Sequence, residues 1–424
     1  MLPGPGPECH APTADGNGPG SYHRPVDVRV TSFAEAQECY RHKDLRQALY
    51  DAGEVIMSDV IVNLHGDEHR ARRRLENRLF RRDTFHFYES DLFPGIIQTT
   101  LAPYLAEGRT ELVSFGHQLM MNLAALTAGV DRPKGTPEES FRLYDYLKTF
   151  IEGATLAHYT GDKAAKAAEV VEKLEAFDAE FLLPAIARRA ALIESVNAGA
   201  ATDDDLPRDV LTVLLRNQDK IPMSHESLRR EIAFYLLAGA HTSATAFNRV
   251  MHNIFQWIEA HPADARRVTE DRLFVQRCTH ETIRLQPSSP TGMRWALEDI
   301  TLSNGRTFAK GDRVILDLTF INRDPELFGA DAEDFNPTRP LPPEVAPWGL
   351  SFGQGMHACI GQDLAAGLRF MDGDALDSHL FGLVPVAVQT MFDHGCRPDP
   401  NDAPEMDAST TRPYFGRYPV VFVR

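Results

Sequence analysis

The sequence has 424 residues, of which 43% are hydrophobic and 25% are charged, so it contains enough apolar material for a large globular core. The formal net charge of -16 argues against broad nucleic-acid binding, because a duplex would repel such a surface. No apolar run reaches the ~18 residues of a membrane span, and the start lacks the pattern of a signal peptide. These features predict a soluble, cytoplasmic protein with no nucleic-acid partner and no membrane anchor.

The start of the chain differs in composition from the rest. The first 25 residues contain six prolines and five glycines, which predicts a flexible tail over residues 1–25 and a single domain over residues 26–424. The five cysteines lie far apart with no C-x-x-C pair, which indicates a reducing compartment and no disulfide framework; they are Cys9, Cys39, Cys278, Cys359 and Cys396.

Helical patterns dominate up to about residue 290. Residues 66–82 predict a basic helix with seven arginines, and residues 163–197 predict one or two helices broken by Pro184, which cannot donate a helical hydrogen bond. A long helix is predicted from Ser224, as N-cap, to about Ala260. Its apolar run is too short to span a bilayer, so we expect a central helix of a large helical domain.

Short strands follow from residue 294 onward. Residues 300–303 and 306–308 flank Asn304-Gly305, a strong signal for a two-residue hairpin, and residues 314–318 predict a further strand. Residues 322–351 are rich in Pro, Asp and Gly and predict a long ordered loop, a kind of segment that is usually functional. Residues 362–376 are predicted to be helical.

Cys359 lies where this loop turns into the last of these helices, in the stretch of residues 352–361. A thiolate there would gain from the helix dipole and from backbone N–H donors, so we expect a lowered pKa. Gly353 and Gly355 permit a close approach to a flat ligand, Gly361 removes a side chain beside it, and Phe352 can pack over the sulfur. A cysteine at such a junction is by itself more often structural.

The spacing F-x-x-G-x-x-x-C-x-G in this stretch resembles the heme-binding loop of the cytochrome P450 family. The resemblance implies a mainly α single-domain fold with a small β region and a long central helix over the heme. It also implies heme b (iron protoporphyrin IX) with Cys359 as the axial thiolate ligand of the iron. Glu281-x-x-Arg284 and Arg339 match the family's buried triad, which would hold the heme loop in place.

A second match lies in the long helix, at residues 238–242. The resemblance implies that Ala238 and Gly239 open a groove for O2 and that the Thr242 hydroxyl passes protons toward it. The structural alternative is a Thr242 hydroxyl bonded to its own helix carbonyl. His241 stands where the family usually has Asp or Glu. Since a histidine has a pKa near ~6.5, it can still relay protons at neutral pH, so Thr242 and His241 are the catalytic candidates.

Four cationic groups are suited to the heme propionates, because charge-assisted donors anchor carboxylates. By resemblance these are His69 and Arg73 in the basic helix, Arg294, and His357. Taken singly, His69 and Arg73 would more often be surface residues. The remaining arginines of the basic stretch are predicted to be surface or a docking face for an acidic electron-transfer protein; they are Arg70, Arg72, Arg74, Arg78, Arg81 and Arg82.

The resemblance implies a monooxygenase that inserts one oxygen atom from O2 into a lipophilic small molecule. No flavin or iron-sulfur motif is visible, so electrons are expected from a separate ferredoxin-type donor and its reductase. The alternatives are peroxide-driven or non-oxygenase chemistry on the same heme fold, a heme-thiolate sensor without turnover, and a thiol enzyme with Cys359 as nucleophile and His357 as base. Substrate contacts are expected from residues 55–64, 150–190, 288–293, Ala238 with Thr245, and 414–415.

Overall fold

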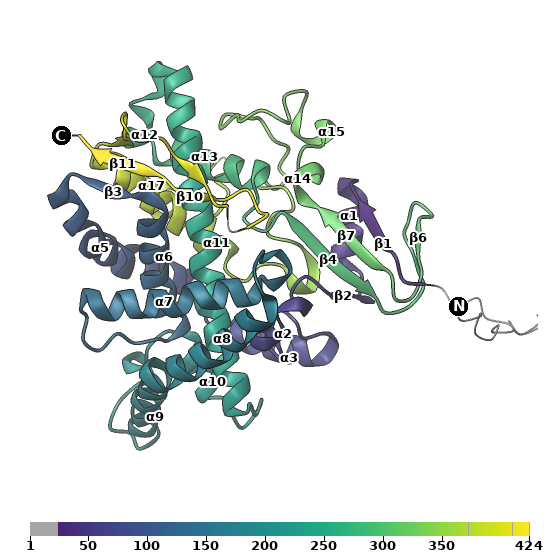
Figure 1. Ribbon diagram of the computed structural model, residues 1–424, viewed down its shortest axis with the longest axis vertical. Helices are drawn as coiled ribbons and strands as arrows, with labels where there is room; N and C mark the ends of the chain where they lie inside the picture. Colours follow the sequence, from purple (N-terminus) through teal and green to yellow (C-terminus); the bar gives the residue numbers. More distant parts are fainter. Residues whose placement is uncertain (1–23, 372, 409, 424) are drawn as a thin grey trace, which may run out of the picture.

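The computed structural model describes residues 24–371, 373–408 and 410–423, so almost all of the expected tail over residues 1–25 lies outside the described residues. The predicted fold class, mainly helical with small sheets, is confirmed. Figure 1 shows one long helix, α11 (His225–Ala260), running through the helical part, with α6 (Leu112–Ala128) and α7 (Pro137–Ala154) on one side and the largest sheet on the other. No described helix is long and apolar enough to cross a membrane.

The long helix begins and ends where the sequence predicts. The Ser224 side chain accepts a hydrogen bond from Ser227 N at 3.0 Å, and the helix ends at Ala260, before Pro262. α6 packs along it at close range, because a Cβ added to Gly239 of α11 would lie 3.0 Å from Ala124 Cβ of α6. The larger hydrophobic core surrounds this crossing, and a second core lies between the largest sheet and α1 (Phe33–Arg41).

The predicted basic helix over residues 66–82 is too long. The structure ends it at Glu76 and starts a new helix at Arg82, because the chain turns at Asn77 to bring Leu79 into the core. The helices predicted over residues 163–197 are confirmed as two, joined by a π-helical turn that ends just before Pro184.

The α-helices not yet given are α2 (Glu54–Met57), α3 (Gly66–Glu76), α4 (Arg82–Phe87), α5 (Phe93–Glu107), α8 (Lys163–Phe177), α9 (Leu183–Asn197), α10 (Val210–Leu215), α12 (Arg267–Glu270), α13 (Arg272–Leu285), α14 (Leu318–Ile321), α15 (Pro325–Phe328), α16 (Gln362–Ala366) and α17 (Leu383–Asp393). The 3-10 and π segments are η1 (Asp51–Gly53), η2 (Tyr88–Leu92), η3 (Leu156–His158), η4 (Asp178–Leu182), η5 (Asp203–Asp205), η6 (Pro262–Asp264), η7 (Gly355–His357) and η8 (Leu376–Ser378).

The strands form one sheet of four and several smaller units. The sheet of four has the order β1 (Asp27–Val30), β7 (Arg313–Asp317), β4 (Thr291–Ala296) and β2 (Leu45–Gln47), with β1 parallel to β7 and the other pairs antiparallel. A three-stranded sheet has the order β3 (Arg109–Glu111), β11 (Pro419–Phe422) and β8 (Cys396–Pro398), and β9 (Glu405–Met406) pairs with β10 (Phe415–Arg417). The register Gln47↔Arg294↔Val314 places Arg294 in the middle of the larger sheet.

The predicted hairpin at Asn304-Gly305 is confirmed as β5 (Ile300–Thr301) and β6 (Thr307–Phe308). Its loop is one residue longer than predicted, because Leu302 N donates to Arg306 O and closes a loop of three residues. Gly305, at φ +86°, occupies the left-handed position that such a loop needs. The strand predicted over residues 314–318 is β7, and residues 322–351 form the expected loop apart from the single turn α15.

The helix predicted over residues 362–376 is wrong. α16 stops at Ala366, and the chain leaves the helix at Gly367 (φ +73°), returns at Gly382 (φ +91°) and resumes as α17. A Cβ added to Gly382 would lie 2.2 Å from Gly367 N, so the two ends of this excursion, residues 367–382, are in contact. The Gln276 Nε2 amide of α13 holds both ends, since it lies 3.0–3.3 Å from the carbonyls of residues 366, 368, 380 and 381.

Candidate functional site

A chamber of about 330 Å³ lies between α11 and the loop that carries Cys359, within the size range of small-molecule sites. Cys359 is enclosed by the protein but exposed to this chamber, whereas Cys39, Cys278 and Cys396 are free and buried. The chamber brings together the residues predicted to act in catalysis or cofactor binding: His69, Arg73, Ala238, Gly239, His241, Thr242, Arg294, Phe352, His357, Cys359 and Gly361.

The loop before Cys359 has the glycine-dependent shape that the sequence predicts. Gly353 and Gly355 have φ values of +64° and +68°, and a Cβ on Gly355 would lie 2.5 Å from Tyr40 O. A Cβ on Gly361 would meet nothing within 4 Å, so this residue leaves open space beside the thiol. Phe352 packs edge-on against Trp348, with ring centroids 5.6 Å apart, and closes the inner side of the loop.

The expected lowering of the Cys359 pKa is wrong in this structure. Burial raises the pKa of the thiol above its usual value; a hydrogen bond from Gly361 N–H and the charge of Arg73 oppose this only in part. The helix that follows has only five residues, so its dipole is weak. Gly361 is nevertheless the backbone donor that the sequence suggested, and it stabilises the thiolate form.

The four predicted anchors share a cluster at the wall of the chamber. The His69 and His357 rings lie 4.3 Å apart, and Arg73 Nη2 donates to Ala358 O at 2.7 Å, beside the cysteine. Arg294 is 4% exposed and its Nη1 donates to Gln47 Oε1 at 2.6 Å. Burial, followed by the charge of Arg73, lowers the pKa of His69 to about 4.

This cluster fits an anionic ligand. Both ring nitrogens of His69 and Nε2 of His357 are buried without a partner in the described protein, and among the described residues no carboxylate pairs with Arg73 or Arg294. Unpaired buried donors and cations are costly, so a ligand that carries carboxylates would stabilise them. The propionates of heme have this chemistry, and the open face at Gly361 beside the Cys359 thiol leaves room for a flat ring. The residues present therefore fit the cofactor that the sequence implies.

The buried triad predicted from the E-x-x-R motif is confirmed. Glu281 accepts two hydrogen bonds of 2.7 Å from Arg284 and two further bonds, of 3.1 and 3.2 Å, from Arg339. The side chains of the two arginines are 0% and 3% exposed. Arg284 also donates to the carbonyls of Asn322 and Ala332 at 2.7 Å, so the triad ties α13 to the long loop that leads to Cys359.

Opposite the cysteine, Thr242 shows the structural alternative rather than the expected contact. Its Oγ1 donates to Ala238 O at 2.7 Å, within the same helix. Gly239 was expected to open a groove for O2. In the structure the space left by its missing side chain faces Ala124 of α6, and a Cβ on Gly239 would lie 3.0 Å from Ala124 Cβ. Sequence reasoning missed Ser288, whose Oγ donates to Thr242 O at 2.8 Å; it lies inside the range 288–293 that was expected to contact substrate.

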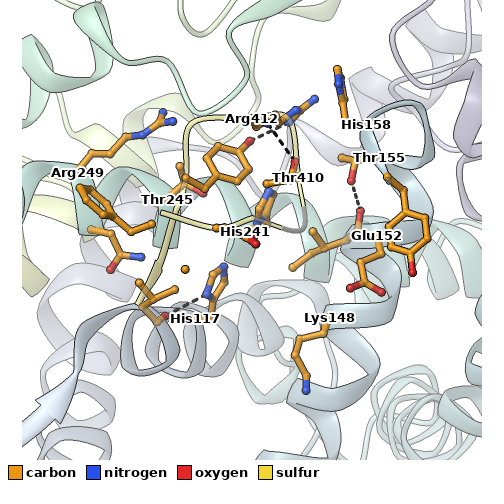
Figure 2. A pocket seen from close by; sticks show the side chains of 18 of the residues that line it. His117, Lys148, Glu152, Thr155, His158, His241, Thr245, Arg249, Thr410 and Arg412 are labelled. Atoms are coloured by element: carbon orange, nitrogen blue, oxygen red, sulfur yellow. Dashed lines mark hydrogen bonds between the residues drawn. The ribbon is translucent and has the colours of Figure 1, made fainter. Parts of the chain in front are cut away.

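His241 lies in the wall between the chamber and a second cavity of about 310 Å³, shown in Figure 2. Its ring stacks on His117 of α6 at 5.9 Å and meets the edge of Tyr414 at 5.5 Å. Burial, followed by the charges of His117 and Arg412, lowers the pKa of His241 well below its usual value, so the ring is neutral at pH 7. No local motif predicts a role for His117 or Arg412, because these residues come from segments that are distant in the sequence.

Arg72 was predicted to lie on the surface, and this is wrong. Its side chain is 6% exposed, and Nη1 donates to Glu231 Oε2 of α11 at 2.7 Å and to Asp59 O at 2.7 Å. Glu231 also accepts from Ile61 N, at 3.0 Å, and Glu76 accepts from the Tyr235 hydroxyl nearby. The other arginines of the basic stretch are exposed as predicted: Arg70, Arg74, Arg78, Arg81 and Arg82.

Comparisons with known proteins agree with this geometry. The family model described as Cytochrome P450 matches residues 179–367. Pulcherriminic acid synthase of Bacillus subtilis is 25% identical over 359 residues, which cover 82% of this chain and 81% of that protein. A bifunctional cytochrome P450/NADPH–P450 reductase 2 of the same organism is 27% identical over 187 residues, covering 39% of this chain but only 17% of that longer protein.

Solved structures share the fold. CalO2 matches with a TM-score of 0.70 at 18% identity, covering 93% of this chain and 90% of that one. P450BioI, solved in complex with an acyl carrier protein ligated to hexadec-9Z-enoic acid, matches with a TM-score of 0.68 at 20% identity, covering 93% and 92%. The arrangement of helices around α11 is therefore the cytochrome P450 fold.

Proposed function

We propose that this chain, which has the cytochrome P450 fold and matches that family's model over residues 179–367, is a heme-thiolate monooxygenase that inserts one oxygen atom from O2 into a lipophilic small molecule. The observation that carries this proposal is the position of Cys359, which opens on a chamber whose other wall is the Ala238–Thr242 segment of α11. The relatives include a longer, fused protein of which the match covers only a small part, so similarity to it does not establish the activity of this chain. The proposed activity therefore depends on the residues of the site.

The cofactor of this proposal is heme b: the Cys359 thiolate would hold its iron, and His69, Arg73, Arg294 and His357 would bind its propionates. When bound, a thiolate-ligated heme uses two electrons and two protons to split O2, giving one oxygen atom to the substrate and one to water. Arg73 serves twice, because it also bonds the carbonyl of Ala358 and so fixes the loop.

The residues of α11 supply the proton side of the reaction. Thr242 is exposed to the chamber, and its hydroxyl can turn from the Ala238 carbonyl toward the ligand space at the cost of one helix-internal hydrogen bond. Ser288 holds the Thr242 carbonyl and so positions this turn of the helix. His241, being neutral, offers one nitrogen that donates and one that accepts, which suits a relay that carries no net charge.

Electrons are proposed to come from a separate ferredoxin-type protein and its reductase in the cytoplasm. The exposed arginines 70, 74, 78, 81 and 82 form one cationic segment next to the anchors on α3, which supports docking of an acidic donor. A second candidate function, peroxide-driven chemistry on the same heme, is favoured by one observation. The Thr242 hydroxyl is engaged within its own helix, and the residue before it is no carboxylic acid.

The proposal is tested by reducing the purified protein under carbon monoxide. A thiolate-ligated heme gives a strongly red-shifted Soret band; Cys359→Ala and Cys359→His should abolish it. Cys396→Ala is the matched control, because Cys396 is free, buried and does not line the chamber, and should keep the band. Turnover with a surrogate ferredoxin and reductase, against turnover with hydrogen peroxide, then separates the two functions. A colourless protein, or a band indifferent to Cys359, would refute the proposal.

A further inference from the structure

The second cavity is contiguous with the heme chamber. Four residues line both spaces: Ile151, Thr155, His241 and Arg412. The chamber is mainly apolar, whereas the second cavity has a larger share of polar lining (Figure 2), with side chains from α6, α7, α11 and the segment before β10. The two cavities therefore share a wall, and a polar group on a ligand in the chamber can reach Arg412, which lines both spaces.

Arg412 is the cation at the junction of the two spaces. Its Nη1 donates to the Tyr414 hydroxyl at 2.9 Å, its Nε is buried without a partner, and no carboxylate among the described residues pairs with it. Two buried arginines elsewhere in the described chain do pair with carboxylates: Arg189 bonds Asp209 and Asp131, and Arg284 bonds Glu281. Arg412 is thus an uncompensated charge in the part of the chain that the structure describes.

The surroundings add further positive charge or neutral donors. Arg249 lies across the Tyr414 ring, with its guanidinium 5.2 Å from the ring centroid, and it donates to three backbone carbonyls instead of a carboxylate. His117, His158 and His241 line the same cavity. After burial, the charge of Arg412 is the largest cause that lowers the pKa of His158.

Two carboxylates also line this cavity, Glu152 and Asp407. Glu152 is bound by Lys166 at 2.6 Å, and Lys148 pairs with Asp145 at 3.5 Å, so these charges compensate each other at the rim. The predicted propionate anchors do not serve Arg412, because His69, Arg73, Arg294 and His357 line the chamber and not the second cavity. Among the described residues neither Glu152 nor Asp407 forms an ion pair with Arg412, so an anionic ligand other than the cofactor would compensate its charge.

We infer that the substrate carries a carboxylate, which Arg412 binds at the junction while the apolar body of the molecule occupies the heme chamber. The inference rests on the proposed heme-thiolate function and adds the chemical class of its substrate. Arginine binds carboxylates through two parallel N–H groups, and Nε with one Nη offers this fork. The neutral His241 ring, whose Nδ1 is buried without a partner, offers a further hydrogen-bonding group in the same wall. The distal end of the acid, fixed in this way, would determine which carbon lies near the heme.

The test uses the ferric holoenzyme and follows the low-spin to high-spin shift in its absorption spectrum. The probes are matched pairs of n-alkanoic, arylalkanoic and terpenoid acids with their methyl esters. We expect acids to bind roughly 10- to 100-fold more tightly than their esters, the gain of a charge-assisted hydrogen bond at a partly buried site. Arg412→Gln should remove that ratio and Arg412→Lys should restore part of it.

Arg417→Gln is the matched control, because Arg417 lies in the same segment but pairs with Asp402 and lines neither cavity. It should keep the preference for acids. Each variant is first checked for an intact carbon monoxide band, so that loss of folding or heme is not read as loss of the anion site. If the wild-type protein shows the carbon monoxide band, three results overturn this inference alone: no acid shifts the spin state, esters bind as tightly as acids, or Arg412→Gln keeps the acid-to-ester affinity ratio. If the wild-type protein lacks the band, the proposed function itself is overturned.

Discussion

Removal of the Arg72 side chain should destabilise the protein far more than removal of a neighbouring arginine. The Arg72 and Glu231 side chains are 6% and 0% exposed, and Arg72 Nη1 lies 2.7 Å from Glu231 Oε2. In Arg72→Met the Glu231 carboxylate keeps only the Ile61 N–H as a donor. An uncompensated buried charge of this kind costs about 3–5 kcal/mol, a large part of the about 5–15 kcal/mol that stabilises a typical domain.

The measurement is urea unfolding of the holoprotein, followed by circular dichroism and by heme absorbance. Arg74→Met, an exposed site on the same helix, is the control and should change the free energy of unfolding by less than about 0.5 kcal/mol. The double variant Arg72→Met/Glu231→Leu removes both charges and should be more stable than Arg72→Met alone. A loss for Arg72→Met that equals the control, or a double variant no milder than the single one, would refute the reasoning.

Three further results are expected. Burial raises the pKa of Glu231 to about 7, above its value of 4.5 in the unfolded chain, so this group makes stability fall as pH rises between these values; Glu231→Gln should remove that part of the slope in pH-dependent unfolding. Gly355→Ala should lose heme, measured by the Soret to protein absorbance ratio, because its Cβ would meet Tyr40 O and its φ is left-handed; Gly305→Ala, equally left-handed but in open space, should keep it. His241→Ala should raise peroxide release per electron consumed while heme content stays constant; unchanged coupling would place the proton route elsewhere.

The sequence predicted those parts of the site that lie in contiguous motifs. The Cys359 loop depends on glycines at fixed offsets, and Glu281 with Arg284 depends on an i,i+3 spacing, so short-range geometry determines both. The central helix was equally visible, because Ser224 caps it and Pro262 follows its end. In each of these cases the residues that act together are neighbours in the chain or on one helix face.

The errors occur where polar residues behave as core. His69, Arg72, Arg73 and Glu76 follow the i, i+3, i+4, i+7 pattern of a buried helix face, but all four are polar or charged. A search for apolar periodicity does not find such a face, and Arg72 was therefore predicted to lie on the surface, whereas His69 and Arg73 were singled out only by resemblance to a known family. The partners of Arg72 and Glu76 are Glu231 and Tyr235 on α11, far away in sequence, so only the folded chain shows that these two charged residues are hydrogen-bonded inside the protein.

The lining of the second cavity was invisible for a related reason. His117 and Arg412 are nearly 300 positions apart, and no spacing rule connects them. The predicted length of the helix after Cys359 was wrong for a local reason. Gly367 and Gly382 both have positive φ, and one helix ends before the first while another begins after the second. A stronger weight on those glycines would have predicted the break.

Because Gly367 and Gly382 are in contact, the segment between them is a loop whose two ends meet. Such a loop can accept an insertion without moving the helices on either side of it. The chain leaves and re-enters at one place, so α16 meets α17 whatever the length of the segment between them. Doubling the length of a flexible loop costs only about 0.6 kcal/mol in closure entropy. The tip is exposed at Asp374 and Leu376, whereas Gln276 holds the base. A segment inserted at Asp374 should therefore leave the Cys359 loop undisturbed.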